Sequence, residues 1–153
     1  MIKMIINTKL LGEVEISEED IINFPDGILG FEESRNFVLL DIPENEFFKI
    51  LQDIKHEYVS FIVANPWNFK SDYEIDIPDE ELYNLDINKK EQIATINIVT
   101  LTDIFENSTI NLLAPIIINS EKKIGKQYVL NNVSYRTKLP LFLKEDDIVA
   151  GFK

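Results

Sequence analysis

The chain has 153 residues and a hydrophobic content of 45%, which is enough for one domain with its own core. Its 27 acidic and 15 basic residues give a net charge of −12, which disfavours binding to nucleic acid and to anionic lipid surfaces. The absence of cysteine excludes disulfides, thiolate metal sites and a cysteine nucleophile. The sequence shows neither a membrane-length apolar run nor the pattern of a signal peptide, so we expect a cytoplasmic protein.

Short runs of β-branched and aromatic residues, separated by turn residues, extend along most of the chain. Such runs predict strands, and their spacing is typical of a sandwich or a barrel. We expect strands at residues 2–7, 12–16, 21–24, 37–40, 47–51, 59–64, 93–101, 110–118 and 127–130. The prediction is an all-β fold, a small closed or partly open antiparallel β-barrel-like domain that covers residues 1–143.

Helical signals are scarce, so we expect only one or two short helical turns. The best candidate is 78–85, where Pro78 precedes three acids and apolar residues recur at helical spacing. Residues 17–20 and 31–34 are long enough for a single turn each. The last residues, 144–153, are predicted to form a C-terminal tail that either packs on the body or is mobile.

The residue pattern contains no recognisable catalytic constellation. The single histidine, His56, lacks the serine and aspartate context that would predict a triad. Carboxylates are abundant, but spacing marks out no pair as the two acids of a hydrolase. Gly27 and Gly30 lack the remaining residues of a nucleotide-binding loop, and the Pro-Asp-Gly sequence at 25–27 predicts a tight turn. We therefore predict no catalytic residue, no cofactor and no metal site.

Acidic residues are concentrated in residues 71–88, which contain seven acids and no base. A calcium loop is excluded there, because the glycine and the final glutamate that it requires are missing. As a strand, the segment would place Asp72, Glu74 and Asp76 on one face and apolar side chains on the other. Two interpretations stay open: a contact face for a basic partner, or a solvated edge whose charge prevents aggregation.

Residues 65–69 form an aromatic segment directly after a predicted strand. Asn65 and Pro66 favour a turn, and Trp67 follows them. In one interpretation the aromatic rings fold back onto the core. In the other, Trp67 anchors a protein partner, because tryptophan often contributes much of the binding energy of an interface.

Several motifs, in this order along the chain, resemble those of the flagellar assembly factor family, FliW. They are Gly12-Glu13, FPDGILGFE at 24–32, FIVANP at 61–66, DYE at 72–74, NLLAPIIIN at 111–119, and Gln127 with Tyr135. FPDGILGFE and NLLAPIIIN are specific in combination at this separation. The resemblance spans about residues 3–143, and residues 144–153 do not follow the family pattern.

The resemblance implies a non-enzymatic regulator with a compact β-barrel-like fold. Members of this family bind flagellin before its secretion, and they bind CsrA, an RNA-binding repressor of flagellin translation. Once flagellin is exported, the freed factor captures CsrA beside its RNA site and permits flagellin translation. The implied partners are CsrA and flagellin, with no direct contact to nucleic acid or membrane. An acidic surface suits this role because it attracts a basic protein and repels RNA.

Most residues of the family motifs are expected to have structural roles in turns and at strand ends; these are Phe24, Pro25, Gly27, Gly30, Asn111, Ala114 and Pro115. The residues that we predict to contact partners are Asn65, Pro66, Trp67, Asp72, Glu74, Asp76, Asp79 and Glu80. The alternative, from another class, is a small β-barrel ligand-binding protein or an acid-based hydrolase. A polar cavity with convergent carboxylates would favour it, and a filled apolar interior would count against it.

Overall fold

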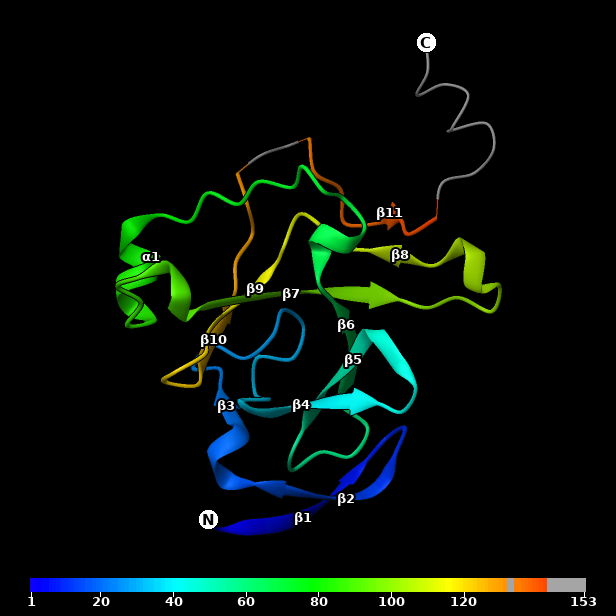
Figure 1. Ribbon diagram of the computed structural model, residues 1–153, viewed down its shortest axis with the longest axis vertical. Helices are drawn as coiled ribbons and strands as arrows, with labels where there is room; N and C mark the ends of the chain where they lie inside the picture. The colour runs from blue at the N-terminus through cyan, green and yellow to red at the C-terminus, as the bar shows by residue number, and fades with distance from the viewer. Residues whose placement is uncertain (132–133, 143–153) are drawn as a thin grey trace.

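The computed structural model describes residues 1–131 and 134–142, and most of its elements are strands (Figure 1). The strands are β1 (Lys3–Thr8), β2 (Gly12–Ser17), β3 (Ile21–Asn23), β4 (Asn36–Ile42), β5 (Asn45–Asp53), β6 (Ser60–Ala64), β7 (Ile93–Thr100), β8 (Thr109–Ile110), β9 (Ile116–Asn119), β10 (Ile124–Gln127) and β11 (Leu139–Pro140). The described helical elements are α1 (Asp79–Asn84) and 3-10 turns at Glu18–Asp20, Pro66–Asn68, Lys90–Gln92 and Phe105–Asn107. The all-β prediction is confirmed. The predicted tail at 144–153 lies outside the described residues.

Nine of the described strands form one sheet, and seven of these strands close into a ring, with β8 and β11 outside it. Their order is β11-β8-β7-β6-β5-β4-β3-β10-β9, and β9 also pairs with β7. The strands from β7 through β6, β5, β4, β3 and β10 to β9 therefore form a closed ring of paired neighbours (Figure 1). The pairings are antiparallel except for β3–β10, where Ile124 lies opposite Asn23 in a parallel pair. The predicted fold class is confirmed in that the sheet is partly ring-like, but the parallel pairing makes the sheet mixed and so corrects the prediction of an antiparallel one.

Side chains that alternate along the ring strands fill the interior, as the period-2 geometry of a strand requires. Phe37 on β4, Leu51 on β5 and Val63 on β6 are completely buried there. Phe24 and Ile28, from the segment between β3 and β4, are buried in the same cluster. Each such side chain contributes about 1.5–3 kcal/mol to folding when it leaves water. The interior of the ring is therefore a packed apolar core.

The hairpin of β1 and β2 is a separate two-stranded sheet. Its apolar side chains Ile6 and Ile16 pack against Val38 on β4, and all three are buried. Because β4 alternates, Val38 faces this hairpin while the neighbouring Phe37 belongs to the interior cluster. The central strand thus has apolar contacts on both faces, which explains the nearly continuous apolar run in its sequence.

The predicted strand at 110–118 is wrong, because the chain is interrupted between β8 and β9. Asn111 causes the interruption: its Oδ1 accepts hydrogen bonds from the backbone N–H groups of Leu113 and Ala114, both at 3.1 Å. An asparagine side chain that bonds to the following backbone forms a turn and competes with strand pairing. Pro115, which follows, has no backbone N–H to donate to a neighbouring strand. Residues 111–119 are mostly apolar, so the sequence pattern indicated a strand and not this turn.

Two further predicted boundaries differ from the structure. The predicted strand at 127–130 begins earlier, as β10, and ends at Gln127. Beyond it, the N–H groups of Tyr128 and Leu130 donate to loop carbonyls of Pro115 and Leu113, at 2.9 and 2.8 Å. The predicted helix is confirmed as α1, although Pro78 lies just before its first residue. Of the two predicted single turns, 17–20 forms a 3-10 turn and 31–34 forms a hydrogen-bonded turn without helix.

Candidate functional site

The acidic segment at 72–77 is not a strand, which corrects the prediction for these residues. Its burial nevertheless alternates as predicted: Tyr73 is buried, Ile75 and Ile77 are half-buried, and the acids between them are exposed. No strand of the described chain lies beside it as a ladder partner. The periodic pattern therefore correctly indicated the buried face and wrongly implied a neighbouring strand.

The side chain of Tyr73 attaches this segment to the closed ring of strands. Its hydroxyl donates to the carbonyl of Leu112 at 2.5 Å and accepts from Nδ2 of Asn97 at 3.3 Å. Its ring contacts those of Tyr135, with centroids 4.8 Å apart, and Trp67, at 5.9 Å. Burial raises the pKa of Tyr73 to about 12, so its hydroxyl stays neutral at physiological pH.

We expect Tyr73→Phe to lower the free energy of unfolding by about 1–3 kcal/mol, because it leaves the buried carbonyl of Leu112 without its donor and removes one of the two acceptors of the Asn97 amide, which keeps its bond to the carbonyl of Asn111. The substitution should also remove the dependence of folding stability on pH that the Tyr73 hydroxyl causes. The raised pKa means that the folded state holds a proton that the unfolded state has lost, so wild-type stability falls as pH rises from about 10 towards 12. Urea unfolding at pH 7 and at about pH 11, inside this window, measures both effects. Equal stability of the two proteins would contradict the role given to this hydroxyl.

Trp67 also helps to attach the acidic segment to the rest of the protein, and part of its side chain is accessible to solvent. Its Nε1 donates to the carbonyl of Tyr73 at 2.9 Å, yet 41% of the residue is exposed. Asn65 has a structural role, since its Oδ1 accepts from the N–H of Trp67 at 2.9 Å and caps the 3-10 turn, in which Pro66 is buried. Of the two interpretations of this segment, folding back is correct for Phe69, whose half-buried ring stacks on Phe48 with centroids 6.0 Å apart. Trp67 both packs inward and presents an accessible edge.

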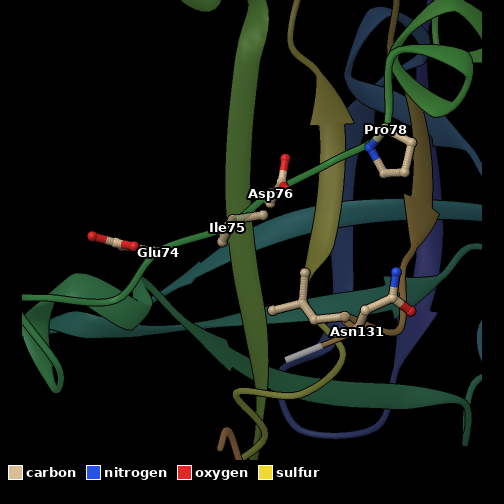
Figure 2. Close-up of a pocket in the computed structure, with 6 residues that line it drawn as sticks. Glu74, Ile75, Asp76, Pro78 and Asn131 are labelled. Atoms are coloured by element: carbon tan, nitrogen blue, oxygen red, sulfur yellow. The ribbon is translucent and has the colours of Figure 1, made fainter. Parts of the chain in front are cut away.

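A groove of about 880 Å³ lies beside the acidic segment. One side is lined by Glu74, Ile75, Asp76 and Pro78, and the other by Leu130 and Asn131. Figure 2 shows the first four along one extended stretch of chain, with Asn131 across the groove. Ile75 and Leu130 supply apolar surface between the polar groups. The arrangement suits a polypeptide that carries both basic and apolar side chains.

Lysine side chains neutralise part of the acidic segment. Lys70 lies 3.0 Å from Asp72, and its hydrogen bond and charge lower the pKa of that carboxyl. The other two ion pairs join this region to a later part of the chain, Glu81 with Lys126 at 2.7 Å and Asp86 with Lys122 at 3.9 Å.

The remaining four acids, within the residues that the structure describes, form no ion pair; they are Glu74, Asp76, Asp79 and Glu80. All four are exposed, and two of them line the groove. Of the seven acids at 71–88, these four are therefore the ones whose charge no lysine of the described residues neutralises. Sequence reasoning missed the opposite wall of the groove, because Leu130 and Asn131 carry no local signal for binding.

Within the residues that the structure describes, these acids do not gather into a metal site. The His, Asp and Glu side chains of those residues include no group of three or more placed to hold a metal ion. The carboxylates of Glu74 and Asp76 point in different directions (Figure 2). The filled interior of the ring counts against the alternative of a ligand-carrying barrel, as the sequence analysis anticipated.

His56, the single histidine, holds a loop in place. Its Nδ1 lies 3.0 Å from Oδ2 of Asp53, whose side chain is almost entirely buried. Burial alone would raise the pKa of Asp53, but hydrogen bonds from the His56 ring, the backbone of Lys55 and His56, and Ser34 lower it below 3.8. The carboxylate therefore stays ionised and caps the turn after β5.

Comparison with known proteins identifies the family. Residues 4–141 match the family model described as FliW protein. The chain belongs to the FliW family. The flagellar assembly factor FliW of Clostridium botulinum strain Langeland is 41% identical over 142 residues, which cover 93% of this chain and 99% of that protein. The corresponding protein of Clostridium novyi strain NT is 42% identical over 139 residues, covering 91% and 97% of the two chains.

A solved structure supports the same assignment to FliW. The crystal structure of a flagellar assembly factor FliW superimposes with a TM-score of 0.88 at 40% sequence identity, and the match covers 93% of this chain and 99% of the other. The family resemblance inferred from the motifs is therefore confirmed. Separately, no helix in the described residues is long and apolar enough to cross a membrane.

Proposed function

We propose that this member of the FliW family is a non-enzymatic cytoplasmic regulator that binds flagellin and CsrA. In this proposal, binding antagonises CsrA and so permits flagellin to be translated. The relatives that match almost the whole chain are named flagellar assembly factors, which supports a role in building the flagellum. The observation that carries the proposal is the set of exposed carboxylates, without ion pairs, beside a partly apolar groove.

The charge distribution explains how one small protein would affect an RNA-binding repressor. A basic partner is attracted to the carboxylates of Glu74, Asp76, Asp79 and Glu80, and complementary potentials accelerate encounter more than they strengthen the final complex. Once bound, the chain brings a net charge of −12 close to the repressor, and this charge repels the phosphates of RNA. Antagonism then requires no overlap with the RNA site.

Titration calorimetry with purified CsrA and with purified flagellin tests the proposed partners directly. We expect saturable one-to-one binding of each to this chain at micromolar concentration. Adding flagellin to the preformed complex with CsrA then shows whether the two compete. If neither protein binds in moderate salt, the proposed function is wrong.

The double substitution Glu74→Lys with Asp76→Lys is expected to slow association with CsrA by about tenfold at low salt, because it reverses the charge on the groove wall. Stopped-flow association rates at several salt concentrations measure the effect. The matched control is Glu18→Lys with Glu19→Lys, which makes the same change in net charge at the exposed 3-10 turn after β2. An equal slowing in both variants would assign the effect to net charge and would contradict a local contact face.

A further inference from the structure

We propose that residues 74–77 are an open β-edge, to which a partner adds an extended segment with alternating basic and apolar side chains. This inference rests on the proposed function, because it describes how the groove would hold a protein partner. Strand addition supplies affinity through backbone hydrogen bonds and specificity through alternate side chains.

The backbone of the segment is extended and unpaired. Among the described residues, the N–H groups of Ile75, Asp76 and Ile77 donate to no protein acceptor, and the carbonyls of 74–77 accept from no protein donor. Backbone groups in ordered segments are nearly always paired within the protein or hydrated. A row of groups that only water satisfies is the template that an added strand uses.

One hydrogen bond indicates the direction in which this edge points. The N–H of Glu74 donates to the hydroxyl of Tyr135 at 2.8 Å, so it points to the side where the chain after β10 lies. In an extended chain, the N–H groups of residues two apart point the same way. The N–H of Asp76 therefore points to this side as well, where Leu130 and Asn131 form the opposite wall of the groove.

The side chains around the groove define the occupant. Glu74 and Asp76 alternate with the half-buried Ile75, and Leu130 lies across the groove. An added strand would place every second side chain beside the carboxylates and the others against the apolar surface. Opposite charges favour lysine or arginine at the first set of positions, and burial favours Val, Ile or Leu at the second. The occupant is thus a basic and apolar alternating strand.

A pair of substitutions at one position separates strand addition from simple charge attraction. Asp76→Ala and Asp76→Pro both remove the carboxylate, but only proline removes the N–H and places a ring at the edge. Neither change breaks a hydrogen bond of the free protein, because the N–H of Asp76 has no protein acceptor. Proline also favours an extended residue before it, which the segment already provides.

We expect Asp76→Ala to weaken binding of CsrA two- to threefold, as loss of about one opposite-charge pair would. Asp76→Pro should weaken it by a further factor of about ten, from the lost backbone bond and the steric block. Equal dissociation constants for the two variants, with wild-type binding intact, would overturn strand addition and leave the proposed function standing. Failure of the wild type to bind CsrA would instead contradict the proposed function.

Two measurements on the wild type test the edge without any substitution. A synthetic peptide with alternating lysine and valine should bind more tightly than a peptide of the same composition with the lysines in one block. In the complex with CsrA, the amide of Asp76 should exchange with deuterium much more slowly than in the free protein. Equal binding of the two peptides, or unchanged exchange at this amide, would refute the open β-edge.

Discussion

Replacing Phe24 with alanine is expected to lower the free energy of unfolding by about 3–5 kcal/mol. The ring is completely buried, and it contacts Phe37 edge-on with centroids 5.4 Å apart. It also lies over Gly125 of β10, where an added Cβ would come within 2.5 Å of the ring. The neighbouring strand therefore has no side chain with which to fill the space that alanine would leave.

Urea unfolding followed by circular dichroism measures this loss, with Phe47→Ala as the control. Phe47 is on β5 and is 54% exposed, so its truncation should change stability by less than about 1 kcal/mol. A loss below about 1 kcal/mol for Phe24→Ala would show that the core relaxes around the cavity.

Gly27→Ala is expected to cost about 3 kcal/mol or more, from backbone strain and steric overlap together. Gly27 has φ +69, and an added Cβ would lie 2.6 Å from the backbone of Phe31 and Glu32. Those atoms belong to the turn that carries Ile28 into the core, so they cannot move without disturbing it.

Gly12→Ala is the matched control for this substitution. Gly12 has the same φ of +69, but no atom lies within 4 Å of the position of an added Cβ. It should cost about 1–2 kcal/mol, which is the penalty of the left-handed conformation alone. The difference in thermal midpoints between the two variants isolates the steric overlap. Equal midpoints would mean that the turn at 25–32 opens freely to make room.

Much of the fold could be predicted from local patterns. Short runs of β-branched and aromatic residues indicated β1 to β7, and Pro25 and Gly27 indicated the turn that the structure contains. Closure of the ring was beyond such reasoning, because the pairs β7–β9 and β3–β10 join residues far apart in the sequence. A local pattern indicates which face of a strand is buried, but it does not identify the neighbouring strand.

The candidate site, like the fold, could be predicted only in part from the sequence. The sequence pattern located the acids and their exposed face, but it could not show which of them are neutralised. Lys126 and Lys122 reach Glu81 and Asp86 from a distant part of the chain. The opposite wall of the groove, at Leu130 and Asn131, was missed for the same reason, since only folding brings it beside residue 76.

The single parallel pairing between β3 and β10 has a consequence for the order of folding. The strands β4, β5 and β6 follow one another as antiparallel neighbours, so their contacts require only short loops to close. The β3–β10 seam requires Asn23 to meet Ile124, and its ladder has one residue pair. Closing so long a loop carries a larger entropic cost for few new contacts. We therefore expect the β3–β10 seam to close after β4, β5 and β6 have paired.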